Sequence, residues 1–173
     1  MTVTLVIGGV GSGKSEYVEG IMDGSGSAMV YIATSEAIDD EMHAKIRAHR
    51  MRRGERWRTL EEARDLGRAL KSCSADEAVL VECIPTWLTN LLVDPDGGIE
   101  VHVDQFLAAI KARKGDTYLV SNEAGSGVMP TGALSRRFVT LLGQTNQKLA
   151  RCAESVILVM AGLPVALKGP LPR

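Results

Sequence analysis

The sequence predicts an α/β fold, with a mostly parallel β-sheet that carries helices on both faces. One domain is expected to span residues 1–173. Short apolar runs recur along the chain, and stretches of helical periodicity separate them. Five runs are predicted as strands: Thr4–Gly8, Met29–Ala33, Ala78–Glu82, Thr117–Ser121 and Val156–Met160. Their near-continuous Val, Ile and Leu content is typical of central strands that are buried on both faces.

Helices are expected between the runs. The predicted helices are Ser15–Met22, Asp39–Arg53, Glu61–Ser72, Thr86–Val93, Val103–Arg113 and Ala133–Ala153. Alternation of strand and helix favours parallel pairing, and such sheets bind ligands at the carboxyl ends of their strands. Candidate site residues are therefore those that follow the runs, namely Gly8–Ser15, Thr34–Glu36, Glu82–Cys83 and Asn122–Gly127.

Composition narrows the class of protein. The 173 residues are 45% hydrophobic and 24% charged, and the net charge is −1, so the whole chain has no electrostatic tendency to bind nucleic acid. No apolar stretch reaches the roughly 18 residues that a membrane span needs. The three cysteines, Cys73, Cys83 and Cys152, lack metal-ligand spacing. We read them as reduced thiols of a cytoplasmic protein, with Cys83 and Cys152 in the core.

A phosphate-binding loop follows the first run. The pattern G-x-x-x-x-G-K-[ST] is met between a strand and a helix, which predicts a P-loop fold of the RecA-like type and a site for ATP or GTP. Glycines let backbone N–H groups turn toward phosphate oxygens, and the helix N-terminus adds positive charge. Lys14 is predicted to reach the β and γ phosphates, and the Ser15 hydroxyl to bind Mg²⁺. The loop residues are Gly8, Gly9, Val10, Gly11, Ser12, Gly13, Lys14 and Ser15.

A carboxylate at the end of a neighbouring strand would complete such a site. Glu82 ends the run Ala78–Glu82 and is predicted to act with Ser15 at the metal. A structural ion pair is the alternative reading of the same residue.

A basic segment surrounds His49. Between residues 45 and 58 the chain has one acid, Glu55, and seven cations: Lys45, Arg47, Arg50, Arg52, Arg53, Arg56 and Arg58. Nearby cations would lower the pKa of His49, keep its ring neutral and nucleophilic, and neutralise a triphosphate under attack. A packed core histidine on a solvated helix is an equally good reading of these residues alone. His43 and His102 have no comparable setting and are expected to be exposed.

Several motifs together resemble a known family, the bifunctional adenosylcobinamide kinase/adenosylcobinamide-phosphate guanylyltransferases of cobalamin biosynthesis. The resemblance covers nearly the whole chain. It rests on the motifs Gly8–Ser15, Tyr31–Ser35, Asp39–Met42, His49, Trp57–Thr59, Leu80–Cys83, Thr89–Leu92, Ser121–Glu123 with Gly125, Gly127 and Pro130, and Asn146–Gln147.

The resemblance implies a two-step enzyme. It would phosphorylate the aminopropanol hydroxyl of adenosylcobinamide with a nucleoside triphosphate, then pass GMP from GTP, through a histidine, to the cobinamide phosphate. The guanylylated histidine falls on His49, and a homotrimer is implied. Beyond the phosphate loop, GTP contacts fall on Thr34, Ser35, Glu36, Arg50, Met51, Arg52, Arg53, Glu61 and Glu82. Glu61 is the candidate for reading guanine, because a carboxylate accepts hydrogen bonds from N1–H and the 2-amino group. A plain helix-surface glutamate is the alternative.

Two positions depart from the family pattern. Ala48 stands where a second histidine is common, and Gly11 stands where the loop commonly carries Arg. The loss of that cation bears on the kinase step, so a guanylyltransferase without kinase activity stays open. ATP and GTP are both open as the kinase donor.

A small-molecule P-loop kinase with no covalent intermediate is a further alternative, but it gives His49 no role. A nucleotide switch is less favoured, because the sequence Ser121–Ala124 does not supply the N-K-x-D motif.

Overall fold

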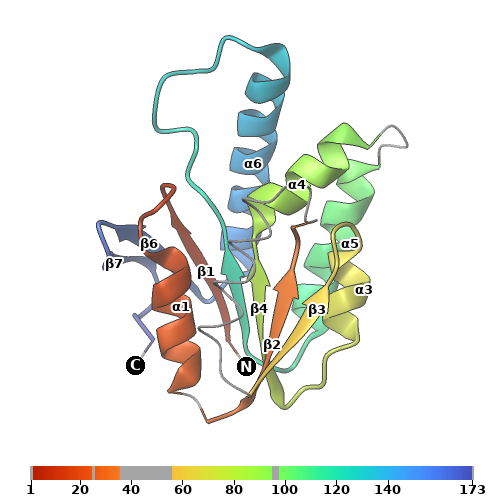
Figure 1. Ribbon diagram of the computed structural model, residues 1–173, viewed down its shortest axis with the longest axis vertical. Coiled ribbons are helices and arrows are strands. Elements are labelled where there is room, and N and C mark those ends of the chain that lie inside the picture. The colour runs from red at the N-terminus through yellow and green to blue at the C-terminus, as the bar shows by residue number, and fades with distance from the viewer. Residues whose placement is uncertain (1, 25, 36–55, 95–97, 173) are drawn as a thin grey trace.

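Seven strands form one sheet in the computed structural model, which describes residues 2–24, 26–35, 56–94 and 98–172. The strand order is β3-β2-β4-β5-β1-β6-β7, and all neighbouring pairs are parallel except β6 and β7 (Figure 1). The strands are β1 (Val3–Gly8), β2 (Ala28–Ala33), β3 (Trp57–Glu61), β4 (Glu77–Glu82), β5 (Thr117–Val120), β6 (Ser155–Met160) and β7 (Leu163–Lys168).

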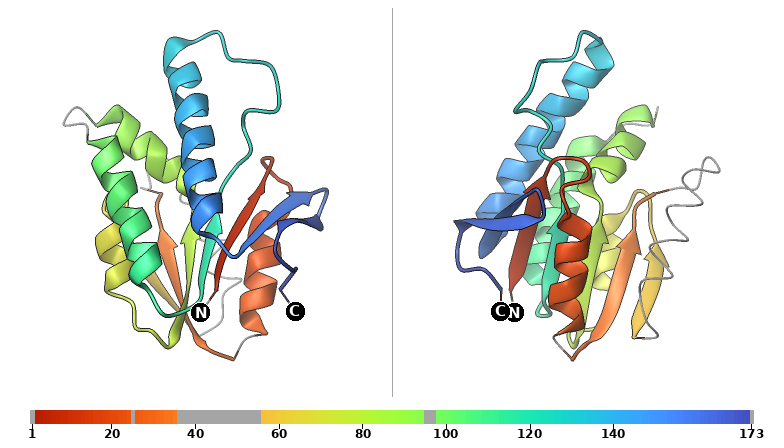
Figure 2. Two further views of the ribbon diagram at one scale, coloured as in Figure 1. Left: turned by 180° about the vertical axis from the view of Figure 1, so that it is seen from behind. Right: turned by 60° about the vertical axis from the view of Figure 1, so that its left-hand side comes forward.

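Helices cover both faces of the sheet, which confirms the predicted α/β fold. The described helices are α1 (Lys14–Asp23), α3 (Leu66–Lys71), α4 (Ile84–Val93), α5 (Ile99–Ala112) and α6 (Ala133–Cys152). Helices α3 to α6 pack on one face and α1 packs on the other, as the two views of Figure 2 show. The predicted helix Asp39–Arg53 lies outside the described residues.

Successive residues of the central strands enter two separate cores. In β2, Val30 and Ile32 pack under α3 to α6, whereas Met29 and Tyr31 pack against the α1 side. Side chains on a strand alternate between the two faces of the sheet, so a strand that is covered on both sides has no polar face. This explains the near-continuous apolar runs in the sequence.

One predicted helix is wrong at its start. The chain from Trp57 to Glu61 is strand β3, and α3 begins only at Leu66. The signal for the true start is Asp65, whose carboxylate accepts the Arg68 amide at 2.8 Å and caps the first turn. Glu61 is therefore a strand-end residue and not part of a helix surface.

Strand β7 was not predicted. It forms a hairpin with β6 through Ala161 and Gly162, whose φ values are 51° and 77°. Two consecutive residues with positive φ suit the twist of a two-residue hairpin. The strand is an edge strand, and it keeps Leu163, Val165 and Leu167 exposed.

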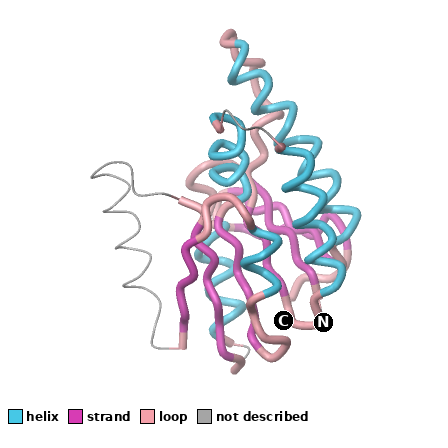
Figure 3. The backbone as a smooth tube through the Cα atoms, turned by 90° about the vertical axis from the view of Figure 1, so that its right-hand side faces the viewer, coloured by secondary structure: helices cyan, strands magenta, loops and turns pink. Residues whose placement is uncertain are grey.

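Helix α6 begins well beyond the carboxyl edge of the sheet and runs back along it (Figures 1 and 3). Residues 133–137, its first turns, are exposed, whereas Leu142, Thr145, Asn146 and Leu149 are buried. None of the helices in the described ranges is long and apolar enough to cross a lipid bilayer.

Candidate nucleotide-binding site

The phosphate loop turns between β1 and α1 through two glycines, and a larger residue at either position would force the neighbouring backbone to shift. A Cβ on Gly8 would lie 2.4 Å from the Val159 carbonyl oxygen of β6. Gly13 has φ 94° at the N-terminus of α1, in the left-handed region, and its carbonyl accepts the Tyr17 amide at 3.0 Å. The loop is therefore set tightly against β6 while its tip, Val10, is 92% exposed.

Lys14 is buried beneath this loop. Its Nζ donates to the Gly9 carbonyl at 2.6 Å and lies 3.5 Å from the Ser12 hydroxyl. Burial lowers the pKa of the ammonium from its ordinary value, and the nearby Cys83, Glu82 and Glu16 oppose that shift. The ammonium thus already lies against the loop whose N–H groups suit phosphate oxygens.

Ser15 and Glu82 are brought together, as the position of Glu82 at a strand end predicted. The Ser15 hydroxyl donates to Oε1 of Glu82, which is half-buried at the carboxyl end of β4. A hydroxyl next to a carboxylate is a set of hard oxygen donors, the kind that Mg²⁺ prefers. The two residues therefore fit a divalent cation at the phosphate loop.

Thr34 is buried completely at the exit of β2. Its hydroxyl accepts the Cys83 amide at 2.7 Å and donates to the Cys83 carbonyl at 2.9 Å. The next residue, Ser35, is half-buried and leads away from the same edge. In the structure, the Thr34 side chain fastens the end of β2 to the chain that leaves β4.

A hollow of about 310 Å³ lies beside Glu61 at the carboxyl edge. The register of the sheet places Glu61, Ala33 and Glu82 in one row across β3, β2 and β4. The phosphate loop and the exposed Glu61 carboxylate thus share this edge of the sheet. The hollow is lined by Ala33, Ser35, Glu61, Glu62, Ala63 and Arg64.

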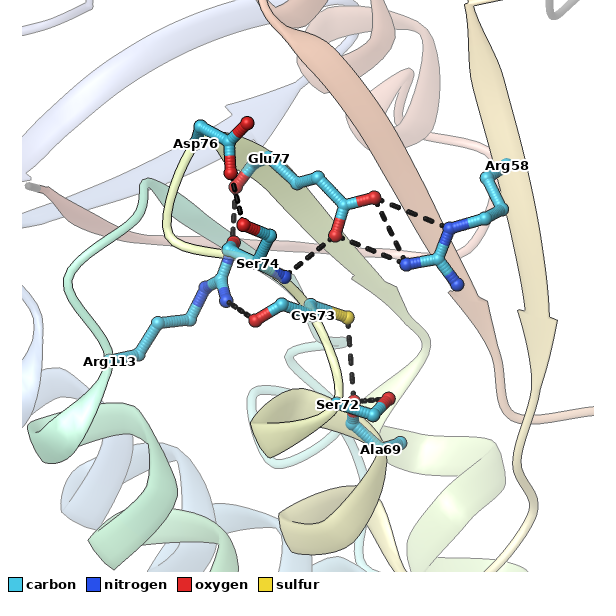
Figure 4. A network of polar contacts seen from close by, with 8 residues as sticks. All are labelled: Arg58, Ala69, Ser72, Cys73, Ser74, Asp76, Glu77 and Arg113. Atoms are coloured by element: carbon cyan, nitrogen blue, oxygen red, sulfur yellow. Dashed lines mark hydrogen bonds and ion pairs between the residues drawn. The ribbon is translucent and has the colours of Figure 1, made fainter.

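The remaining predicted site residues, Glu36, His49, Arg50, Met51, Arg52 and Arg53, lie outside the described residues, as does His43. Two cations of the basic segment are described, and they lie at the opposite edge of the sheet from the phosphate loop. Arg56 donates to the Asp23 carbonyl at 2.9 Å. Arg58 binds both carboxylate oxygens of Glu77 at 3.0 and 3.1 Å (Figure 4).

This amino-edge network is structural. Figure 4 shows Arg113, which directly follows α5, directed at the same turn, where it donates to the carbonyls of Cys73 and Ser74 at 2.9 Å each. Arg56 and Arg58 thus make their described contacts at the amino edge, away from the phosphate loop. The hydrogen bond that the Arg58 guanidinium donates to the Glu77 carboxylate raises the pKa of Arg58, and burial only partly opposes that rise.

Two supports of the phosphate loop come from later in the chain, and sequence reasoning missed the first, because the second lies in the predicted site segment Asn122–Gly127. The Gly162 amide, in the β6–β7 turn, donates to the Ser12 carbonyl at 2.9 Å. The Glu123 amide donates to the Gly8 carbonyl at 3.1 Å, and Asn146 of α6 donates to the Asn122 carbonyl at 3.0 Å. The signal for the first was the Ala161-Gly162 pair, which is typical of a hairpin turn.

The comparisons with known proteins agree with this geometry. A family model described as cobinamide kinase / cobinamide phosphate guanyltransferase matches residues 4–167. The chain belongs to this family. It is 44% identical over 167 residues to the bifunctional adenosylcobalamin biosynthesis protein CobP of Pseudomonas aeruginosa, covering 95% of this chain and 96% of that protein. It is 38% identical over 179 residues to the protein CobU of Escherichia coli, covering 95% and 98%.

Solved structures share the fold at low sequence identity. The flagellar accessory protein FlaH of Methanocaldococcus jannaschii superposes with a TM-score of 0.56 at 10% identity, over 97% of this chain and 78% of that one. The RadB recombinase gives 0.55 at 15% identity, over 99% and 83%. These likenesses support the P-loop sheet architecture of the cobinamide kinase / guanyltransferase family member described here.

Proposed function

We propose that this protein phosphorylates adenosylcobinamide and then transfers GMP from GTP to the resulting phosphate, giving adenosyl-GDP-cobinamide. The observation that carries the proposal is the shared carboxyl edge. There a phosphate loop with a buried lysine, a Ser15–Glu82 pair and a hollow beside Glu61 lie together in a chain of the matching family. Membership of the family supports both activities.

GTP is the substrate that this edge suits. Its phosphates would lie on Gly8–Ser15, where Lys14 supplies a buried positive charge. Its base would extend toward Glu61, whose carboxylate can accept from the guanine N1–H and 2-amino groups. ATP presents neither donor in that arrangement, so the proposal predicts a preference for GTP in the transfer step.

Ser15 and Glu82 would hold Mg²⁺. When bound, the cation would neutralise phosphate charge as it builds up in the transition state. Lys14 contributes a second positive charge from the protein itself, and the loop amides orient the phosphate chain. In the kinase step the substrate hydroxyl attacks the γ phosphorus, and the nucleoside diphosphate leaves.

His49 is the proposed carrier of GMP. Its neutral ring nitrogen attacks the α phosphorus of GTP, a phosphorus–nitrogen bond forms, and pyrophosphate leaves with the electron pair of the broken bond. A phosphate oxygen of the corrinoid then attacks the same phosphorus and releases the imidazole. Ser35, the last described residue before His49 in the sequence, follows the carboxyl end of β2, at the edge where the phosphate loop lies.

The experiment that tests this function is mass spectrometry of the protein after exposure to GTP and Mg²⁺. We expect one GMP adduct on His49, stable to base and labile to acid. His49→Ala should abolish the adduct and GMP transfer but leave phosphorylation of adenosylcobinamide largely intact, because only the transfer step needs the ring nitrogen. An adduct on another residue, or wild-type transfer by the alanine variant, would show that the nucleophile is misplaced.

A guanylyltransferase that lacks the kinase activity is the second candidate. Gly11 favours it, because this exposed loop position carries no cation. Transfer of the γ phosphate from ATP or GTP to adenosylcobinamide, followed with labelled nucleotide, separates the two candidates and identifies the donor.

We further propose a homotrimer. Exposed apolar side chains support an assembly: Val128 is 97% exposed, and Met129 and Leu134 are each 57% exposed, all near the start of α6. Monomers rarely expose contiguous apolar surface without a partner. Sedimentation equilibrium at micromolar concentration would give the mass, and a monomer would contradict the proposal.

A further inference from the structure

A side-chain bridge joins the two segments that leave the carboxyl ends of β2 and β3. Nδ2 of Asn90, on α4, donates to the Thr34 carbonyl at 2.8 Å and to the Ala63 carbonyl at 3.1 Å. One residue earlier on each segment, the Glu62 amide donates to the Ala33 carbonyl at 2.9 Å. The bridge therefore extends the connection between the two segments past the end of the sheet ladder.

Helix α4 holds the turn after β3 at two more points. The buried indole of Trp87 donates to the Arg64 carbonyl at 2.7 Å, and the Arg64 guanidinium binds Asp94 at 2.5 Å. Residues 87 and 90 are spaced by three, so they lie on one side of α4, which leaves the carboxyl end of β4 in Figure 1, and Asp94 directly follows the last residue of the helix. Helix α4 and the residue after it thus fix the turn that forms a wall of the hollow beside Glu61.

The same connection reaches the phosphate loop. Thr34, whose carbonyl Asn90 holds, is bonded through its hydroxyl to both backbone groups of Cys83. Cys83 follows Glu82, whose carboxylate accepts the Ser15 hydroxyl. A continuous series of contacts therefore runs from the wall of the hollow, through Asn90, to the first turn of α1.

We infer that Asn90 is a positioning residue for base recognition. It holds the Ser35 side and the Glu61 side of the hollow at a fixed separation, and it holds the hollow at a fixed distance from the phosphate loop. This inference rests on the proposed function, in which the hollow receives the base of GTP. Without Asn90 the two sides of the hollow would shift, which would weaken contacts with the base but leave contacts with the triphosphate. The selectivity for the base and the KM should therefore change more than kcat.

The test is equilibrium binding of GTP and of ATP, each with Mg²⁺, to the full-length protein and its variants. Asn90→Ala should lower the ratio of GTP affinity to ATP affinity about tenfold, because misplacing a recognition group by a fraction of an ångström has effects of that order. Asn90→Gln keeps both donors and should restore part of the ratio. Thr89→Val is the matched control, because Thr89 is exposed on the same helix and its hydroxyl bonds only to the Pro85 carbonyl among the contacts described.

Thermal unfolding verifies that each variant is folded. If Asn90→Ala does not fold, Asn90→Ser, which keeps one donor, takes its place in the same comparison. A folded variant whose affinities for GTP and ATP fall equally would overturn the inference, because that is the result of a purely structural role. A wild-type protein without GTP preference would refute base reading in this hollow, and the inference with it. A preference that survives in Asn90→Ala refutes the role of Asn90 alone.

Discussion

Replacing Lys14 by methionine should separate catalysis from stability. The ammonium donates to Gly9 at 2.6 Å, so the substitution removes one charged hydrogen bond, worth roughly 1.5–3 kcal/mol. The substitution also removes the cost of burying a charged ammonium, the same cost that lowers the pKa of Lys14. Methionine retains most of the packed aliphatic side chain. The two effects oppose each other, so the free energy of unfolding should change by no more than about 1 kcal/mol.

Activity should behave differently. A preorganised positive group at a developing phosphate charge contributes about 2.7–4 kcal/mol to the transition state, which is a loss of roughly 10²- to 10³-fold in kcat when it is removed. Because the proposed function uses one loop for both triphosphate reactions, kinase activity and guanylyl transfer should fall together. The assays are γ-phosphate transfer to adenosylcobinamide, GMP adduct formation and chemical unfolding. Normal turnover in both reactions would refute the proposed site, and a large loss of stability would refute the balance between burial and hydrogen bonding.

Three further predictions concern the edge and the loop. Gly8→Ala should destabilise the protein by about 1–3 kcal/mol in urea unfolding, because its Cβ would lie 2.4 Å from the Val159 oxygen; an unchanged midpoint would contradict this. Glu61→Gln should lower the GTP/ATP affinity ratio at least about tenfold in competition binding, because an amide offers a donor where guanine needs two acceptors. For Glu62, burial raises the pKa, but hydrogen bonds from the Asp65 and Arg64 amides and from Arg68 outweigh it, and the pKa lies below 4.5. Its stabilisation is therefore present above pH 4.5 and lost as the pH falls through the lowered pKa. The difference in Tm between wild type and Glu62→Gln should shrink in that window, and a constant difference would argue against it.

The central strands and the phosphate loop were predictable because their signals are local. Burial on both faces makes β1, β2 and β4 near-continuous apolar runs, and the loop is a contiguous motif. The edge strands were not predictable in this way. In β3, Trp57 and Leu60 are only half-buried, and the charged Arg58 and the polar Thr59 stand between them, so this five-residue edge strand shows no clear alternation of apolar and polar residues. In β7 most side chains are exposed, so no buried face produces an alternation of apolar and polar residues in the sequence.

Residues that are close in sequence can lie at opposite edges of the sheet. Arg58 is three residues from Glu61, yet an extended strand rises about 3.3 Å per residue, which separates them by roughly 10 Å along β3. One therefore pairs with Glu77 at the amino edge and the other ends at the carboxyl edge. The Asn90 bridge could not be read from the sequence either, because its two acceptors are backbone carbonyls 56 and 27 residues away.

Placing both reactions at one edge has a chemical consequence. The kinase step attacks the γ phosphorus and the transfer step attacks the α phosphorus, and a single bound GTP presents both atoms along one chain. In the proposed function, the described residues would hold that chain at two ends, with the loop and Lys14 at the phosphates and Glu61 at the base. Under this proposal, the nucleophile that arrives, the substrate hydroxyl or His49, would decide which reaction occurs, without a rearrangement of the nucleotide. Both attacks would need GTP in the same position. The connection through Thr34 and Asn90 would keep it there, because it links the phosphate loop to the hollow proposed for the base.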